Sequence, residues 1–171
     1  FGGFLQTPWW DHGQRPANDT WVWRLGQWVQ QQPEHSPPPR AGHALAFDEA
    51  VGRVVLFGGI GEQAGSCGTP DSALCSDAWE WDGRDWSPLS PPVRPPARAL
   101  HAMAYDAARQ QLVLVGGVGA QSGSCGPAGS THCLDTWTLG RAGAVPHLLA
   151  SFEVAHSASL ATSTADPASK E

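Results

Sequence analysis

Short runs of apolar and polar residues along the chain predict β-strands. Residues 43–47 alternate small and large side chains, and residues 53–57 form a β-branched and aromatic run that ends at two glycines. Residues 79–81 alternate again, Asp82-Gly83 is typical of a hairpin turn, and Trp86 begins a return strand. Together these runs predict one antiparallel sheet of four strands.

The same pattern returns 58 residues later (98 minus 40). Segment 40–48 (RAGHALAFD) returns as 98–106 (RALHAMAYD), and segment 54–59 (VVLFGG) returns as 112–117 (LVLVGG). Segment 77–79 (DAW) returns as 135–137 (DTW), and 19–21 (DTW) precedes it by the same step. Several separate elements that recur in register indicate a structural repeat.

One repeat copy allows a helical interpretation when it is taken alone. Residues 101–115 contain good helix formers, including an Ala-Met-Ala segment. The equivalent segment of the preceding copy has Gly52 in its middle and Val54-Val55 shortly after it, which disfavours a helix. We therefore predict strands in both copies.

The pattern R-x-x-H-A-x-A-[FY]-D, then an apolar strand ending in Gly-Gly, then D-x-W-x-W-D-G-x-x-W, resembles the kelch repeat over about residues 1–139. The resemblance implies an all-β, kelch-type β-propeller in which each copy is one four-stranded blade. Trp23 and Trp81 depart from the family, which usually has Tyr there. The third copy lacks a Trp equivalent to Trp28 and Trp86, so its fourth strand is expected to be irregular or to come from residues 147–154.

The repeats amount to about three blades of four-stranded antiparallel sheet. We expect blade pieces at about 1–39, 40–97 and 98–154, with strands two to four in the first, and an opening strand at 155–160. Residues 161–171 read as a flexible Ala/Ser-rich tail. Three open blades would expose unpaired strands, so we expect either a partial propeller of a longer chain, which we favour, or half of a ring closed by a second copy.

Composition narrows the function classes. Of the 171 residues, 41% are hydrophobic and 15% charged, which suits a packed core. The chain has 16 acidic against 10 basic residues, and this balance argues against nucleic acid as a partner. No apolar run reaches the roughly 18 residues that a membrane span needs.

All four cysteines lie in the loops between the second and third predicted strands, twice with the spacing C-x7-C. Zinc sites usually have shorter spacings, so we predict disulfides Cys67–Cys75 and Cys125–Cys133. Disulfides imply an extracellular, cell-surface or periplasmic location. Asn18 begins an N-glycosylation sequon, although the same residues also read as the start of a strand.

No catalytic constellation is evident, and we expect neither a catalytic residue, a metal nor a cofactor. Copper-radical oxidases of this architecture use tyrosine ligands, whereas the one tyrosine here, Tyr105, takes a repeat core position. His43 and His101 recur once per copy, so we interpret them as packed side chains bonded to a neighbouring carbonyl, not as ligands or general bases. The alternative function is a segment of a propeller enzyme that acts on a small molecule such as a sugar.

Binding is the function that the loops favour. The extra length of each copy falls in loops 4–18, 60–76 and 118–134, and Pro-rich links follow at 33–39 and 91–96. In kelch propellers these loops and links share one face, and stiffened loops suit recognition. We predict a non-enzymatic binding or scaffold module for a protein or glycan partner. We expect seven tryptophans to pack within the blades, and we place the binding residues in the first loop: Trp9, Trp10, Asp11, His12 and Arg15.

Overall fold

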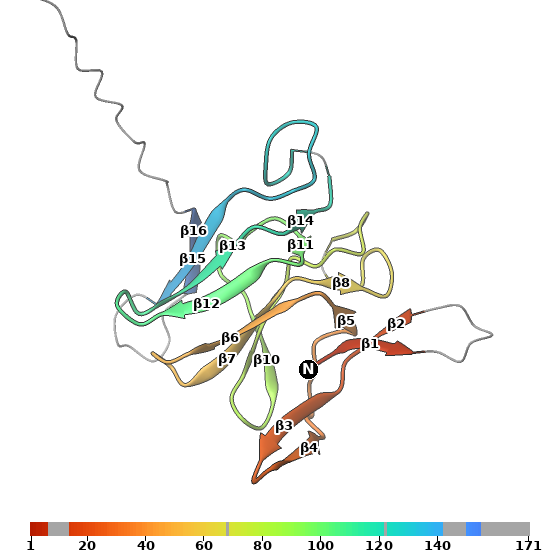
Figure 1. The fold of residues 1–171 in the computed structure, drawn as a ribbon, viewed down its shortest axis with the longest axis vertical. Helices are drawn as coiled ribbons and strands as arrows, with labels where there is room; N and C mark the ends of the chain where they lie inside the picture. The colour runs from red at the N-terminus through yellow and green to blue at the C-terminus, as the bar shows by residue number, and fades with distance from the viewer. Residues whose placement is uncertain (7–13, 68, 122, 142–149, 155–171) are drawn as a thin grey trace, which may run out of the picture.

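The computed structural model describes residues 1–6, 14–67, 69–121, 123–141 and 150–154 (Figure 1). This part of the chain contains strands and turns and no helix, and all of its strand pairs are antiparallel. The all-β prediction is therefore confirmed. No closed ring of sheets is formed by these residues.

Two four-stranded sheets, in each of which the strands pair in the order in which they follow along the chain, form the centre of the molecule. The first consists of β6 (Ala44–Asp48), β7 (Arg53–Phe57), β9 (Ala78–Trp81) and β10 (Trp86–Leu89). The second consists of β12 (Ala102–Asp106), β13 (Gln111–Val115), β15 (Thr136–Arg141) and β16 (Ala150–Val154). Leu56 lies opposite Trp79, and Leu114 opposite Trp137, so the two sheets share one register as the repeat predicts.

Strand β16 supplies the fourth strand of the second sheet, within the segment 147–154 that the sequence offered for it. Phe152 lies opposite Leu139, the register position that Trp86 occupies opposite Trp81. The third copy therefore reaches its last strand through a longer connection than the second copy uses.

The first copy forms a two-stranded sheet of β3 (Thr20–Arg24) and β4 (Gln27–Gln31). We expected three strands here, and among the described residues this expectation is wrong. Phe1 alone occupies the position of a second strand beside β3. The Gly2 amide donates to the Asp19 carbonyl at 3.0 Å, and in the second copy the equivalent Gly58 amide donates to the Asp77 carbonyl at 3.2 Å. One residue cannot form a ladder, so the edge of β3 has no further partner in this part of the chain.

Six further strands, which the sequence did not predict, lie in the loops and in the segments that enter the sheets. The first set is a sheet in the order β1-β2-β5-β8, made of β1 (Gly3–Gln6), β2 (Gln14–Ala17), β5 (Arg40–Ala41) and β8 (Ile60–Gly61). The second set is the pair β11 (Arg98–Ala99) and β14 (Val118–Gly119). The first long loop is thus partly a hairpin.

The core lies between the stacked sheets in two clusters. Val55 and Phe57 point from β7 towards Leu112 and Leu114 of β13, and all four are fully or almost fully buried. Leu56, the alternate residue of β7, points the other way and packs with Trp81 and Trp86 on the side of β3. The period of two along β7 therefore places apolar side chains on both of its faces.

Candidate functional site

The described parts of the three long loops lie on one side of the molecule, on the right and upper right of Figure 1, away from the β6–β7 and β12–β13 turns. Backbone bonds connect them. Ala17 of the first loop lies opposite Arg40, which also pairs with Gly61 of the second loop. The Arg98 amide donates to the Cys75 carbonyl at 3.2 Å and so joins the second loop to the next sheet. We call residues 1–6, 14–18, 60–67, 69–76, 118–121 and 123–134 the loop face.

Both predicted disulfides are present. Cys67 is bonded to Cys75 with a Cα–Cα distance of 4.9 Å, and Cys125 to Cys133 with 4.6 Å. All four side chains are buried at the bases of their loops. A Cβ at Gly119 would lie 2.6 Å from the Sγ of Cys125, so the chain needs glycine where the disulfide meets β14. The spacing of the cysteines in the sequence was enough to predict both disulfides.

An ion pair with a completely buried arginine lies beside the second loop and beside the third. Arg40 is completely buried and makes a two-pronged contact with Asp77 at 2.6 and 2.7 Å. Its guanidinium also donates to the carbonyls of Pro38 and Gly58 at 3.1 and 3.2 Å. These partners satisfy most of the donors of a charge that would otherwise be costly to bury.

The ion pair recurs in the next copy. Arg98 contacts Asp135 at 2.6 and 2.8 Å and donates to the carbonyls of Pro96 and Gly116. Burial opposes ionisation of Asp135, but hydrogen bonds from Arg98 and the Trp137 indole keep its pKa below the ordinary value. The Arg and the Asp of the repeat pattern therefore form an ion pair in both copies. The sequence analysis did not predict this pairing.

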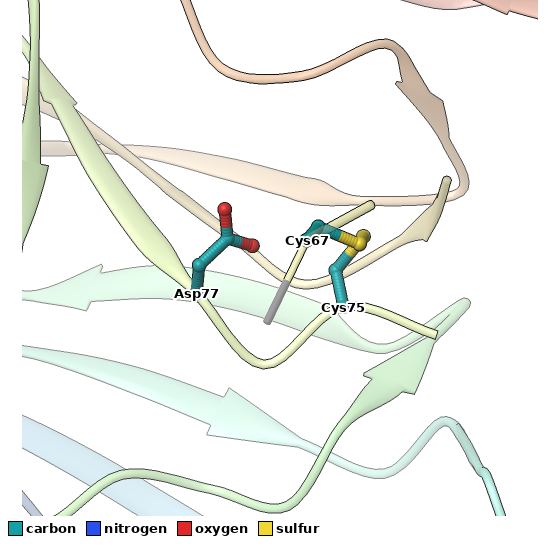
Figure 2. A group of neighbouring side chains, drawn as sticks. All are labelled: Cys67, Cys75 and Asp77. Atoms are coloured by element: carbon teal, nitrogen blue, oxygen red, sulfur yellow. A yellow bond between two sulfur atoms is a disulfide. The ribbon is translucent and has the colours of Figure 1, made fainter. Parts of the chain in front are cut away.

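Cys67, Cys75 and Asp77 lie close together and include ligand types that metals prefer (Figure 2). The two sulfurs are bonded to each other, so neither is a thiolate ligand. The Asp77 carboxylate accepts hydrogen bonds from Arg40 and from the Trp79 indole, the latter at 2.7 Å. This cluster is a structural junction of disulfide and ion pair.

His43 and His101 are packed between sheets, as predicted. Their rings meet Phe1 and Phe57 edge-on, each at a centroid distance of 5.6 Å. A Cβ at Gly58 would lie 2.9 Å from the His101 ring, which explains the glycine there. The backbone carbonyls of Phe1 and Phe57 interact with the rings of His43 and His101, in line with the expected carbonyl contact, and partly oppose the effect of burial on the two pKa values. Burial lowers the pKa of both to about 4, and the nearby arginines add to the effect.

An exposed polar cluster, which the sequence analysis missed, connects the first link to the β9–β10 turn. The backbone amide and Nδ1 of His35 each lie 2.8 Å from a carboxylate oxygen of Asp85. This contact raises the pKa of His35 and lowers that of Asp85. Glu34 lies beside the pair, and Glu34 and Asp85 border a polar hollow of about 360 Å³. Nothing local in the sequence indicates that residues 35 and 85 meet.

The structure describes only some of the other predicted site residues. Arg15 of β2 and Asn18 just after β2 are exposed, so Asn18 is accessible to modification. Trp9, Trp10, Asp11 and His12 lie outside the described residues.

The Pro-rich links are partly structural. Pro37 and Pro95, at equivalent positions in the two links, are fully buried. Each link therefore packs into the molecule before it reaches the loop face.

Comparison with known proteins gives a likeness of fold. No family model matches the sequence, and no curated protein matches it. The solved structure titled "Structure of YjhT" has a TM-score of 0.51 and 15% sequence identity over 83% of this chain. The match covers 38% of the YjhT chain. The likeness therefore concerns an all-β arrangement of antiparallel sheets and does not extend to activity.

The described residues contain no helix long and apolar enough to cross a membrane.

Proposed function

We propose that the chain is a segment of a kelch-type β-propeller and serves as a non-enzymatic binding module. In this proposal the loop face binds a protein or glycan partner. The repeat register of the two central sheets and the likeness of fold to YjhT support the architecture. The assignment of these sheets to kelch-type propeller blades rests on the sequence pattern.

The observation that carries the proposal is the rigid base of the second and third long loops. A disulfide closes each of these loops, and a buried arginine paired with a partly buried aspartate lies next to it. Loops that are already held in one conformation lose less entropy on binding. The arrangement therefore favours recognition by the loop tips.

The exposed side chains of the loop face suit a mixed polar and apolar contact. Asp71 and His132 are exposed at the second and third loops, and Leu134 is 74% exposed. Two disulfides are typical of an oxidising environment, so we place the module outside the cell, on its surface or in the periplasm. Extracellular proteins and glycans are the partners available there.

The test is a screen of the immobilised protein against a glycan array and a panel of extracellular protein domains. For any ligand found, we expect Asp71→Arg, His132→Glu and Leu134→Asp each to weaken binding by roughly tenfold or more. The matched controls are Glu49→Lys and Ala107→Lys, exposed residues in the β6–β7 and β12–β13 turns at the other end of the sheets. We expect these to bind as the wild type does.

Two outcomes would contradict the proposal. One is binding that the control variants abolish and the loop variants leave intact. The other is turnover of a sugar by the purified protein that none of the loop variants alters.

A further inference from the structure

The polar cluster between the first link and the β9–β10 turn is particular to one place in the molecule. The ion pairs beside the second and third loops recur from copy to copy and so belong to the repeat fold. Glu34, His35 and Asp85 do not recur: the residues that follow them by one repeat step are Pro92, Val93 and Gly143. The second link folds without such a cluster, so the fold of a copy does not require it.

The three side chains carry donor atoms that divalent transition metals prefer. Nδ1 of His35 lies 2.8 Å from Oδ2 of Asp85, and one donor atom from each of the three residues lies within 4.8 Å of the other two. Two donors bound to one zinc ion at about 2.0–2.2 Å lie between roughly 3 and 4.4 Å apart, whether they are neighbours or opposite each other. The spacing in the molecule is therefore close to that of ligands around a single ion.

The backbone fixes both segments of the cluster. The His35 amide donates to Oδ1 of Asp85 at 2.8 Å, which turns the other carboxylate oxygen towards the imidazole. The Asp85 amide donates to Oδ1 of Asp82, also at 2.8 Å, and so closes the β9–β10 turn. Pro37, two residues after His35, is fully buried and anchors the link. Because the segments are held in place in advance, little entropy is lost when the ligands meet an ion.

The cluster is accessible to solvent and is negatively charged. The side chain of His35 is 64% exposed and that of Asp85 is 31% exposed. Glu34 and Asp85 border the polar hollow described above, which leaves room for water beside an ion. Arg84 also lines the hollow, but the carboxylates of Glu34, Asp82 and Asp85 outweigh its charge when His35 is neutral. This charge balance suits a divalent cation.

We propose that Glu34, His35 and Asp85 form a surface site for a divalent transition-metal ion such as zinc. Nδ1 of His35 and one oxygen of each carboxylate bind the ion, and water completes the coordination. One nitrogen and two oxygens favour zinc or cobalt over calcium and magnesium, which take oxygen ligands. The ion replaces the hydrogen between His35 and Asp85: a charged ring loses a proton to solvent, and a neutral ring keeps its proton on Nε2.

The site is independent of the loop face and adds a different property to the proposed binding module. Its ligands come from the link of the first copy and from the outer turn of the second copy. A bound ion therefore joins the two copies and stabilises the folded chain, because the ligands come together only when the chain is folded.

Isothermal titration calorimetry of the untagged, chelator-treated protein with zinc chloride at pH 7.5 tests the proposal. We expect one zinc ion per chain, and binding that weakens as the pH falls because protons compete for His35. His35→Gln and Asp85→Asn are each expected to raise the dissociation constant by roughly a hundredfold, and Glu34→Gln by at least about tenfold. Circular dichroism of each variant checks that it is folded.

Glu49→Gln and His132→Gln are the matched controls, since each removes an exposed ligand type outside the cluster. We expect both variants to bind zinc as the wild type does. We also expect calcium chloride to bind at least about a hundredfold more weakly than zinc chloride, because calcium does not favour an imidazole ligand.

Three outcomes would overturn the proposal. The first is no saturable binding of zinc up to about 1 mM, which is weaker than specific sites of this kind bind. The second is zinc binding that all three cluster variants retain, because the ion is then bound elsewhere on the chain. The third is calcium binding as tight as that of zinc, because the carboxylates alone would then account for the site. Loss of zinc binding in the cluster variants, with both controls unaffected, supports the proposed site.

Discussion

Two single side chains, His43 and His101, make the stability of the protein depend on pH because their rings bind protons more readily in the unfolded chain than in the folded one. Burial lowers both pKa values from 6.5 to about 4, so the folded protein holds these rings neutral at pH 7. The unfolded chain binds protons on the same rings near pH 6.5. Their contribution is therefore complete above about pH 6.5 and is lost as the pH falls towards 4.

We expect the free energy of unfolding to fall by about 1–3 kcal/mol between pH 7 and pH 4.5, and His101→Gln to remove roughly half of this loss. Urea unfolding at a series of pH values measures it. His35→Gln is the control. The pKa of His35 is raised by Asp85, so its contribution is present at low pH and is lost as the pH rises, and its exposed position keeps it small.

The carboxylate of Asp135 does not interfere, because its pKa lies below the ordinary 3.8 and thus outside this pH range. If His101→Gln kept the full pH dependence of the wild type, burial of that ring would not be its cause.

At the scale of elements, the disulfides connect loops to strands and do more than close the loops. The backbone of Cys75 donates to the Gly59 carbonyl and accepts from the Arg98 amide, so the disulfide fixes the point where three segments meet. The amide of Cys133 donates to Gly117 in the same way. Loss of a disulfide should therefore loosen β11 as well as the loop itself.

We expect the double change Cys67→Ser and Cys75→Ser to lower the free energy of unfolding by about 2–3 kcal/mol, because a ring of nine residues loses its constraint in the unfolded chain. Urea unfolding measures the change. Hydrogen exchange of the Arg98 amide should become faster, since its acceptor is the Cys75 carbonyl.

The same double change at Cys125 and Cys133 is the matched control. It should lower stability by a similar amount and leave the Arg98 amide protected. A wild-type protein whose unfolding curve is the same with and without reductant would contradict the stabilising role.

At the scale of the whole molecule, the stacking of sheets decides what each tryptophan does. We expected seven tryptophans to pack within the blades. Trp81, Trp86 and Trp137 are buried and Trp79 is partly buried, whereas those of the first copy are exposed: Trp21, Trp23 and Trp28. Equivalent residues thus differ because only the later copies have a sheet in front of them.

We expect Trp81→Ala to cost roughly 3–5 kcal/mol of unfolding free energy, because it leaves a cavity beside Leu56 and Trp86. Trp23→Ala, its equivalent in the first copy, should cost less than about 1 kcal/mol, since the side chain is 58% exposed. Urea unfolding in dilute solution compares the two. Equal costs would mean that the first copy is as closely covered as the second.

The sequence by itself determined the strands of the two central sheets, the repeat register and the disulfide pairs. These features depend on a period of two along each strand and on spacings that recur after 58 residues, so they can be seen without a partner segment. Arg40 and Asp77 were visible as repeated residues, but their pairing was not, because 37 residues separate them.

Only the tertiary structure decided burial, the short strands and the contacts between distant turns. Strands of two residues, such as β5 and β8, carry no periodicity and form because neighbouring segments offer hydrogen bonds. His35 meets Asp85 because the link folds back over the β9–β10 turn. Trp81 is buried and Trp23 is exposed because a neighbouring sheet covers only Trp81. The local sequence around a residue does not specify which distant segment will cover its side chain.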